Sequence, residues 1–145
     1  MEDNSNAAIR VNGDANLTVI SSCISGRDYG IRVSSYGSQS NVVVIVEDTE
    51  IHGGRYGVAC YGRGIAICHV INSRLQMNLG QAVVCDNVGF CAVQRCRMNA
   101  LRSSAITANH VQTLIIDNNI ISNMTAGQAV HASNCDIFQA RFLYS

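Results

Sequence analysis

Apolar residues recur along this chain in three columns that keep a nearly constant spacing. Within each column the interval between successive members is 22 to 27 residues. The first column contains Ile24, Ile51, Leu75, Met98, Ile121 and Leu143, the second Val19, Val46, Val70, Val93, Ile116 and Phe138, and the third Ile9, Ile31, Val58, Val83, Ile106 and Val130. A repeat of this length, kept in step over six rows, predicts a solenoid of stacked rows.

Inside each row the apolar residues alternate with polar ones, as in Leu17 and Val19 or Val58 and Cys60. Period-two alternation rich in β-branched residues predicts short strands with one buried face. No segment carries the spacing of an amphipathic helix. We therefore expect an all-β chain, a single domain over residues 1–145, built as a right-handed parallel β-helix of about six rows with three short strands per row.

The residues between strands fit the corners of such rows. A column of small residues precedes the third strand, where a larger side chain would crowd a tight bend: Gly30, Gly57, Ala82, Ala105 and Ala129. Asp48, Asn72 and Asn118 share the first corner, and Asx residues tolerate the left-handed conformation that turns require. A polar or small stack is expected on the inner side of the second strand: Ser22, Thr49, Ser73, Cys96 and Asn119.

Rows of this length with three strands resemble the right-handed parallel β-helix of the pectin-lyase-like superfamily, which includes viral and phage spike-type β-helices. The resemblance covers residues 7–143 and rests on pattern and row length. The resemblance implies that the substrate of an enzyme with this fold lies along one exposed sheet. Its lyases use a calcium cluster of acids with an Arg base, and its hydrolases use paired Asp residues with a His and an Arg or Lys.

Two outward columns of the second strand carry the candidate site. Glu50, Arg74 and Arg97 form one column, and the next contains His52, Gln76 and Asn99. Neighbouring rows lie about 4.8 Å apart, so Glu50 is expected over Arg74 and Arg74 over Arg97. This face has three interpretations: a solvated ion-pair ladder, a binding face for a polysaccharide, or a catalytic site made of Glu50, His52, Arg74 and Arg97.

Three tyrosines are further ligand-binding candidates. Tyr29 and Tyr56 share a column, where they either stack on each other as structural residues or offer ring faces to a sugar. Tyr36 lies in the low-complexity loop SSYGSQS, at residues 34–40. Loops on rigid solenoids often carry recognition, so Tyr36 is a candidate for ligand or subunit contact.

The carboxylates argue against an enzyme. Glu47, Asp48 and Glu50 are the single acidic cluster, and no second Asp pair stands on the neighbouring row. Glycoside hydrolysis requires two facing carboxylates. We expect no cofactor, and Ca²⁺ only if the chain is a lyase.

Seven cysteines fit neither a C-x-x-C pair nor a zinc-ligand spacing. We expect them to fill the core as small buried hydrophobes. Cys60 and Cys85 share one inward column and Cys68 and Cys91 another, so either pair could alternatively form a disulfide. The four histidines share no column, and no metal site is expected from them.

Zero net charge and 14% charged residues favour neither nucleic acid nor membrane as a partner. No signal peptide or transmembrane segment is predicted, so a virion or extracellular surface and the cytoplasm both remain open. Open β-helix ends require cover, which predicts either a fragment of a longer β-helix or a homo-oligomer that buries its ends, with a trimer favoured. We expect a non-catalytic module for carbohydrate recognition or structural assembly. The alternatives are a polysaccharide lyase or glycoside hydrolase acting on an acidic glycan, and an intracellular protein-interaction scaffold.

Overall fold

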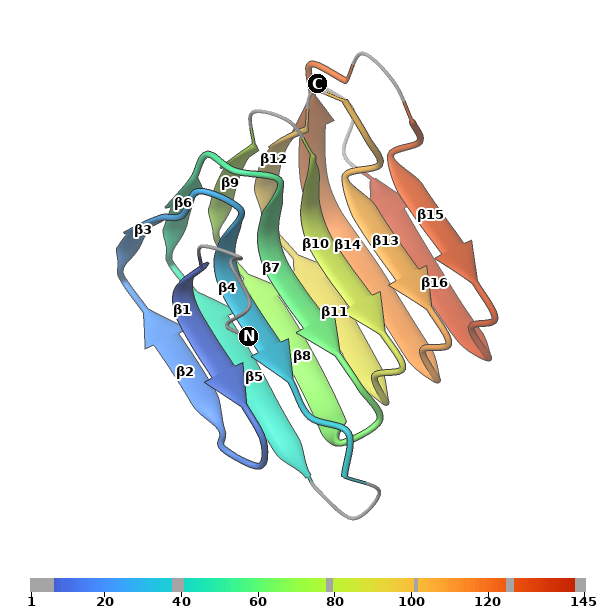
Figure 1. Ribbon diagram of the computed structural model, residues 1–145. Coiled ribbons are helices and arrows are strands. Elements are labelled where there is room, and N and C mark those ends of the chain that lie inside the picture. The colour runs from blue at the N-terminus through green and yellow to red at the C-terminus, as the bar shows by residue number, and fades with distance from the viewer. Residues whose placement is uncertain (1–6, 38–40, 78–79, 101, 125–126, 143–145) are drawn as a thin grey trace.

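The computed structural model describes residues 7–37, 41–77, 80–100, 102–124 and 127–142. The described residues form strands and turns only, wound into a β-solenoid of about five turns (Figure 1). No helical segment with the length and hydropathy of a membrane span occurs in this part of the chain.

Three parallel sheets run along the solenoid, two of them joined through β14, and each of the first four rows contributes one strand to each sheet. Sheet A contains β1 (Ala7–Asn12), β4 (Tyr29–Ser34), β7 (Tyr56–Tyr61), β10 (Gln81–Asp86), β13 (Ile106–Asn109) and β15 (Val130–Ser133). Sheet B contains β2 (Leu17–Ile20), β5 (Val42–Glu47), β8 (Ile65–Ile71), β11 (Phe90–Gln94), β14 (Thr113–Ser122) and β16 (Ile137–Phe142). Sheet C contains β3 (Cys23–Ser25), β6 (Glu50–His52), β9 (Arg74–Met77), β12 (Arg97–Ala100) and the second half of β14.

The expected all-β parallel solenoid is confirmed, and so is the register over five rows. In sheet A, Ile9, Ile31, Val58, Val83, Ile106 and Val130 pair in succession. In sheet C the paired column is Ile24, Ile51, Leu75, Met98 and Ile121. These side chains meet along the axis and form one continuous core.

The final row departs from the expected register. Phe138 pairs with Leu114, and Ala140 rather than Phe138 lies in the column of Ile116. The shift is two residues, which keeps every side chain on its face because side chains alternate with period two. Leu143 lies outside the described residues. In the row before, β14 runs through the first corner, so two of the three expected strands merge there.

The corners form as the sequence predicts. Asp48, Asn72 and Asn118 have φ angles of 49°, 50° and 56°, in the left-handed region, and Ser21 and Arg95 take the same conformation in their rows. A Cβ on Gly57 would lie 2.5 Å from the Ala82 carbonyl oxygen and 2.7 Å from the Leu75 side chain. The small-residue column therefore exists because the neighbouring row and sheet C leave no space.

A ladder of polar side chains lines the inside of the first corner, as the sequence predicts. The hydroxyls of Thr49 and Ser73 each donate to the carbonyl oxygen two residues earlier and accept the backbone N–H of the row before. Farther along, Asn119 Oδ1 accepts from the Cys96 N–H at 2.9 Å and its Nδ2 donates to the Val93 carbonyl at 2.8 Å. These bonds pair backbone groups that the bend removes from the sheet ladders.

Candidate functional site

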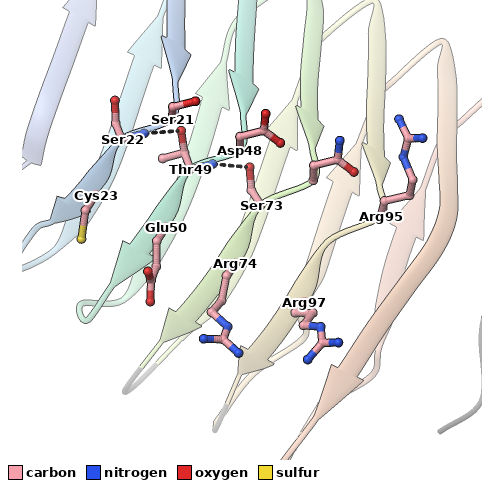
Figure 2. A pocket seen from close by; sticks show the side chains of 11 residues that line it. Ser21, Ser22, Cys23, Asp48, Thr49, Glu50, Ser73, Arg74, Arg95 and Arg97 are labelled. Atoms are coloured by element: carbon pink, nitrogen blue, oxygen red, sulfur yellow. Dashed lines mark hydrogen bonds between the residues drawn. The ribbon is translucent and has the colours of Figure 1, made fainter.

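A groove of about 630 Å³ follows the first corner, between sheets B and C (Figure 2). It crosses four rows, so each row supplies two or three lining residues from equivalent positions. The lining residues are Ser21, Ser22, Cys23, Asp48, Thr49, Glu50, Asn72, Ser73, Arg74, Arg95 and Arg97. Glu50, Arg74 and Arg97 of the predicted face are thus brought together in one groove.

The backbone of the corner decides which side chains face the groove. The left-handed residue of each row turns the chain from sheet B to sheet C, and the next residue points inward to the polar ladder. The first residue of each sheet C strand then points outward, which places Cys23, Glu50, Arg74 and Arg97 in one paired column. A side-chain column along parallel strands repeats at about 4.8 Å.

The three arginines of the groove have no acidic partner in the part of the chain that the structure describes. Among the described residues, no ion pair or side-chain hydrogen bond involves the guanidinium groups of Arg74, Arg95 and Arg97. Arg74 and Arg97 are direct neighbours in the ladder and extend from the same side of sheet C (Figure 2). Like charges at this spacing repel each other, so the arrangement favours an anion between them.

The expected ion-pair ladder from Glu50 to Arg74 has the predicted register but a different partner. Glu50 Oε1 lies 2.8 Å from His52 Nε2, two residues along the same strand and on the same outward face. The Glu50 side chain is 41% exposed and the His52 side chain 38%, which makes the interaction between them weak. Glu50 therefore leaves Arg74 available to a ligand.

Cys23 is not among the site residues that the sequence predicts, yet the structure places it beside Glu50 and His52. One ligand atom of each of these three residues lies within 4.8 Å of the other two. Cysteine, carboxylate and imidazole can hold a divalent metal, and a thiol beside a histidine can act as a nucleophile. The signal available from the sequence was the column itself, in which Cys23 precedes Glu50 by one row.

The acidic cluster of Glu47, Asp48 and Glu50 does not converge. Within the described residues, these three carboxylates do not gather into a group that could share a metal ion. Glu47 ends its strand on the outer face of sheet B, Asp48 sits at the corner, and Glu50 begins β6. The calcium cluster of the lyase alternative is therefore not found in this part of the chain. Asp48 nevertheless lines the groove with Glu50.

Gln76 and Asn99 extend the same face. They line a smaller hollow of about 150 Å³ on sheet C, which shares Arg74 and Arg97 with the main groove. Gln76 and Asn99 also pair directly in the ladder. The predicted second column thus adjoins the arginines and adds planar amide groups to the surface.

The tyrosine candidates lie elsewhere. Tyr29 and Tyr56 stack with ring centroids 4.8 Å apart, and the Arg32 guanidinium lies 5.0 Å from the Tyr29 ring centre. Arg32 also lies over Tyr61, where burial raises the pKa of the phenol well above its usual range. Neither stacked ring lines the groove, so the structural interpretation of their pairing is supported. Tyr36 is exposed at the corner between sheets A and B and does not line the groove either.

No protein-family model, curated protein or solved structure matches the chain. The resemblance to pectin-lyase-like proteins is accordingly confirmed only as a parallel β-solenoid.

Proposed function

We propose that the protein is a non-catalytic β-solenoid module that recognises an acidic polysaccharide along the groove between sheets B and C. The observation that carries this proposal is the row of arginine side chains that have no acidic partner among the described residues, with Arg74 and Arg97 one ladder step apart. Arginine binds carboxylate and sulfate groups with two parallel hydrogen bonds, and rigid strands hold the donors in place.

The shape of the groove supports a polymer rather than a small molecule. The groove is open and crosses several rows, and a linear ligand could lie along it with successive acidic groups at successive rows. Gln76 and Asn99 add donors and acceptors for hydroxyl groups beside the arginines. The polysaccharide class itself rests on analogy of fold, because fold alone does not determine function.

The test is the binding of polygalacturonate, measured by titration calorimetry, to the wild type and to Arg74→Ala/Arg97→Ala. We expect the double variant to lose at least about tenfold in affinity, since each charged hydrogen bond lost costs about 1.5–3 kcal/mol. The matched control is Arg63→Ala/Arg102→Ala, which removes two exposed arginines outside the groove. Neutral dextran should not bind. Equal binding by both double variants would remove the groove from consideration.

A glycoside hydrolase is the second candidate, because Asp48 and Glu50 both line the groove and such enzymes need two carboxylates. Release of reducing ends from acidic polysaccharides, abolished by Glu50→Gln, would establish it. Binding of polygalacturonate without cleavage favours the module.

A further inference from the structure

Four of the seven cysteines meet at one place in the core. Cys60 on β7 pairs in the ladder with Cys85 on β10, and Cys68 on β8 pairs with Cys91 on β11. All four side chains are fully buried, and all four are free thiols. They belong to two adjacent rows and join sheet A to sheet B across the third corner.

Three of the four sulfur atoms are close enough to share one ion, and the fourth contacts one of these three. The Sγ atoms of Cys60 and Cys68 are 3.1 Å apart, and those of Cys68, Cys85 and Cys91 all lie within 4.8 Å of one another. Zn–S bonds of about 2.3 Å in a tetrahedron place neighbouring sulfurs about 3.8 Å apart. The 4.8 Å limit on the sulfurs of Cys68, Cys85 and Cys91 is compatible with this spacing, and the 3.1 Å contact between Cys60 and Cys68 is shorter than it. A disulfide would join only two sulfurs and would leave the mutual proximity of the other sulfurs unexplained.

The rows on either side show that the position does not by itself demand cysteine. In the preceding row the same two columns contain Val33 and Val44, and in the following row they contain Ala108 and Leu114. Both columns change to cysteine in the same two rows and return to apolar residues together. A core that needs only small apolar groups has no reason for this coincidence, whereas a four-ligand site requires it.

We propose that Cys60, Cys68, Cys85 and Cys91 form a closed structural site for a thiophilic divalent ion of the zinc class. On binding, each thiol gives its proton to solvent and its sulfur donates an electron pair to the ion, with no change in oxidation state. Structural zinc sites have four protein ligands and no open position, which agrees with the complete burial of these sulfurs.

Burial also determines when the ion enters. The sulfurs have no contact with solvent, so the metal is taken up while the rows stack, and binding contributes to folding. Cys85 follows Cys60 by 25 positions and Cys91 follows Cys68 by 23, which is one row in each case, whereas Cys68 follows Cys60 by eight positions and Cys91 follows Cys85 by six. None of these intervals is the C-x-x-C spacing by which zinc sites are usually recognised in a sequence.

The first test is the metal content and cobalt spectrum of the full chain. Protein purified under reducing conditions from zinc-supplemented cells should contain one zinc per chain by elemental mass spectrometry. After unfolding with a chelator and refolding with Co²⁺, it should show the sulfur-to-cobalt charge-transfer bands of a tetrathiolate site. A folded wild type that contains no zinc and binds no Co²⁺ would overturn the proposal, as would a mass showing that two of the four cysteines are joined as a disulfide.

Variants identify the ligands. Cys85→Ser and Cys91→Ser should each abolish the tetrathiolate cobalt spectrum, and the matched control Cys96→Ser, buried outside the cluster, should keep it. Cys23→Ser separates this site from the surface group of Cys23, Glu50 and His52. Metal lost in Cys23→Ser and retained in Cys85→Ser would contradict the proposal. If the cluster variants do not fold, the wild type is refolded with and without Zn²⁺ and its melting temperature is measured in both cases. We expect a higher melting temperature with Zn²⁺, and equal melting temperatures would contradict the proposal.

Discussion

At the scale of single residues, the inner corner shows how strongly one side chain can be constrained. Asn119 is 1% exposed and serves the Cys96 N–H and the Val93 carbonyl at once. In earlier rows the hydroxyl groups of Thr49 and Ser73 bind the equivalent backbone groups of the corner. Different residue types therefore occupy one column because each can pair the same backbone groups.

Asn119→Leu should destabilise the protein by about 2–4 kcal/mol, because it leaves a buried N–H without its acceptor and places a larger apolar group in a filled layer. Ser122→Leu is the control, since Ser122 is exposed on the same strand. Urea unfolding followed by circular dichroism measures both. Equal midpoints for the two variants would contradict the assigned ladder.

Because of Cys96, we expect the free energy of unfolding to decrease at alkaline pH. Burial raises the pKa of its thiol from 9.0 to about 11. A raised pKa means that the folded state holds the proton more tightly than the unfolded state, so this contribution is present below pH 9 and is lost as pH rises toward 11. At pH 10 the loss is about 1.4 kcal/mol relative to pH 7.

The free energy of unfolding at pH 7 and pH 10, measured for the wild type and for Cys96→Ala, isolates this effect. We expect the decrease between the two pH values to be smaller in the variant by about 1.4 kcal/mol. An identical decrease in both proteins would show that Cys96 is not the group responsible.

At the scale of elements, the sheets are held together by close approach at the second corner. Gly57 is the second residue of β7 and lies directly against the Ala82 carbonyl of the next row and the Leu75 side chain of sheet C. Any side chain here would push two strands apart.

Gly57→Val should therefore destabilise the protein by about 2–3 kcal/mol or prevent folding. Thr18→Val adds the same side chain at an exposed strand position and should change stability by less than about 0.5 kcal/mol. Thermal melts of the two variants measure the difference in stability between them. A Gly57→Val melt equal to that of the control would be incompatible with the observed packing between sheets.

At the scale of the whole molecule, the last described row leaves apolar groups uncovered. Ile137 and Phe138 on β16 are 53% and 47% exposed. Phe138 lies in the inward column of Leu114, so it faces the core at the end of the described solenoid. An uncovered strand edge with apolar side chains promotes association.

We predict that the 145-residue chain self-associates, with a trimer as the expected state, and that Ile137→Lys/Phe138→Lys shifts it to monomer. Light scattering at several concentrations gives the mass. Ile67→Lys is the control because Ile67 is exposed in the middle of the solenoid. A wild type that remains monomeric at every concentration would contradict this prediction.

The sequence was sufficient for the solenoid and for most of its register. Columns such as Ile24, Ile51 and Leu75 repeat because every row must bury its inner face against the next. The spacing of apolar residues along the chain therefore reveals the length of a row. The register was wrong in the last described row, where Phe138 pairs with Leu114 and Ala140 takes the place beside Ile116; a shift of two residues keeps the same faces buried, so alternation alone does not fix it. The outward column from Glu50 to Arg97 was also predictable, since alternation fixes which side chains face out.

Only the tertiary structure decided what those side chains do. The sequence placed Glu50 over Arg74, but side-chain rotamers direct the carboxylate to His52 and leave the arginines with no acidic partner in the described ranges of the chain. It placed Cys60 over Cys85 and Cys68 over Cys91, but whether the two columns touch depends on how sheets A and B meet at a corner. Spacing along the chain reports contacts within a sheet, whereas contacts between sheets depend on the shape of the closed row.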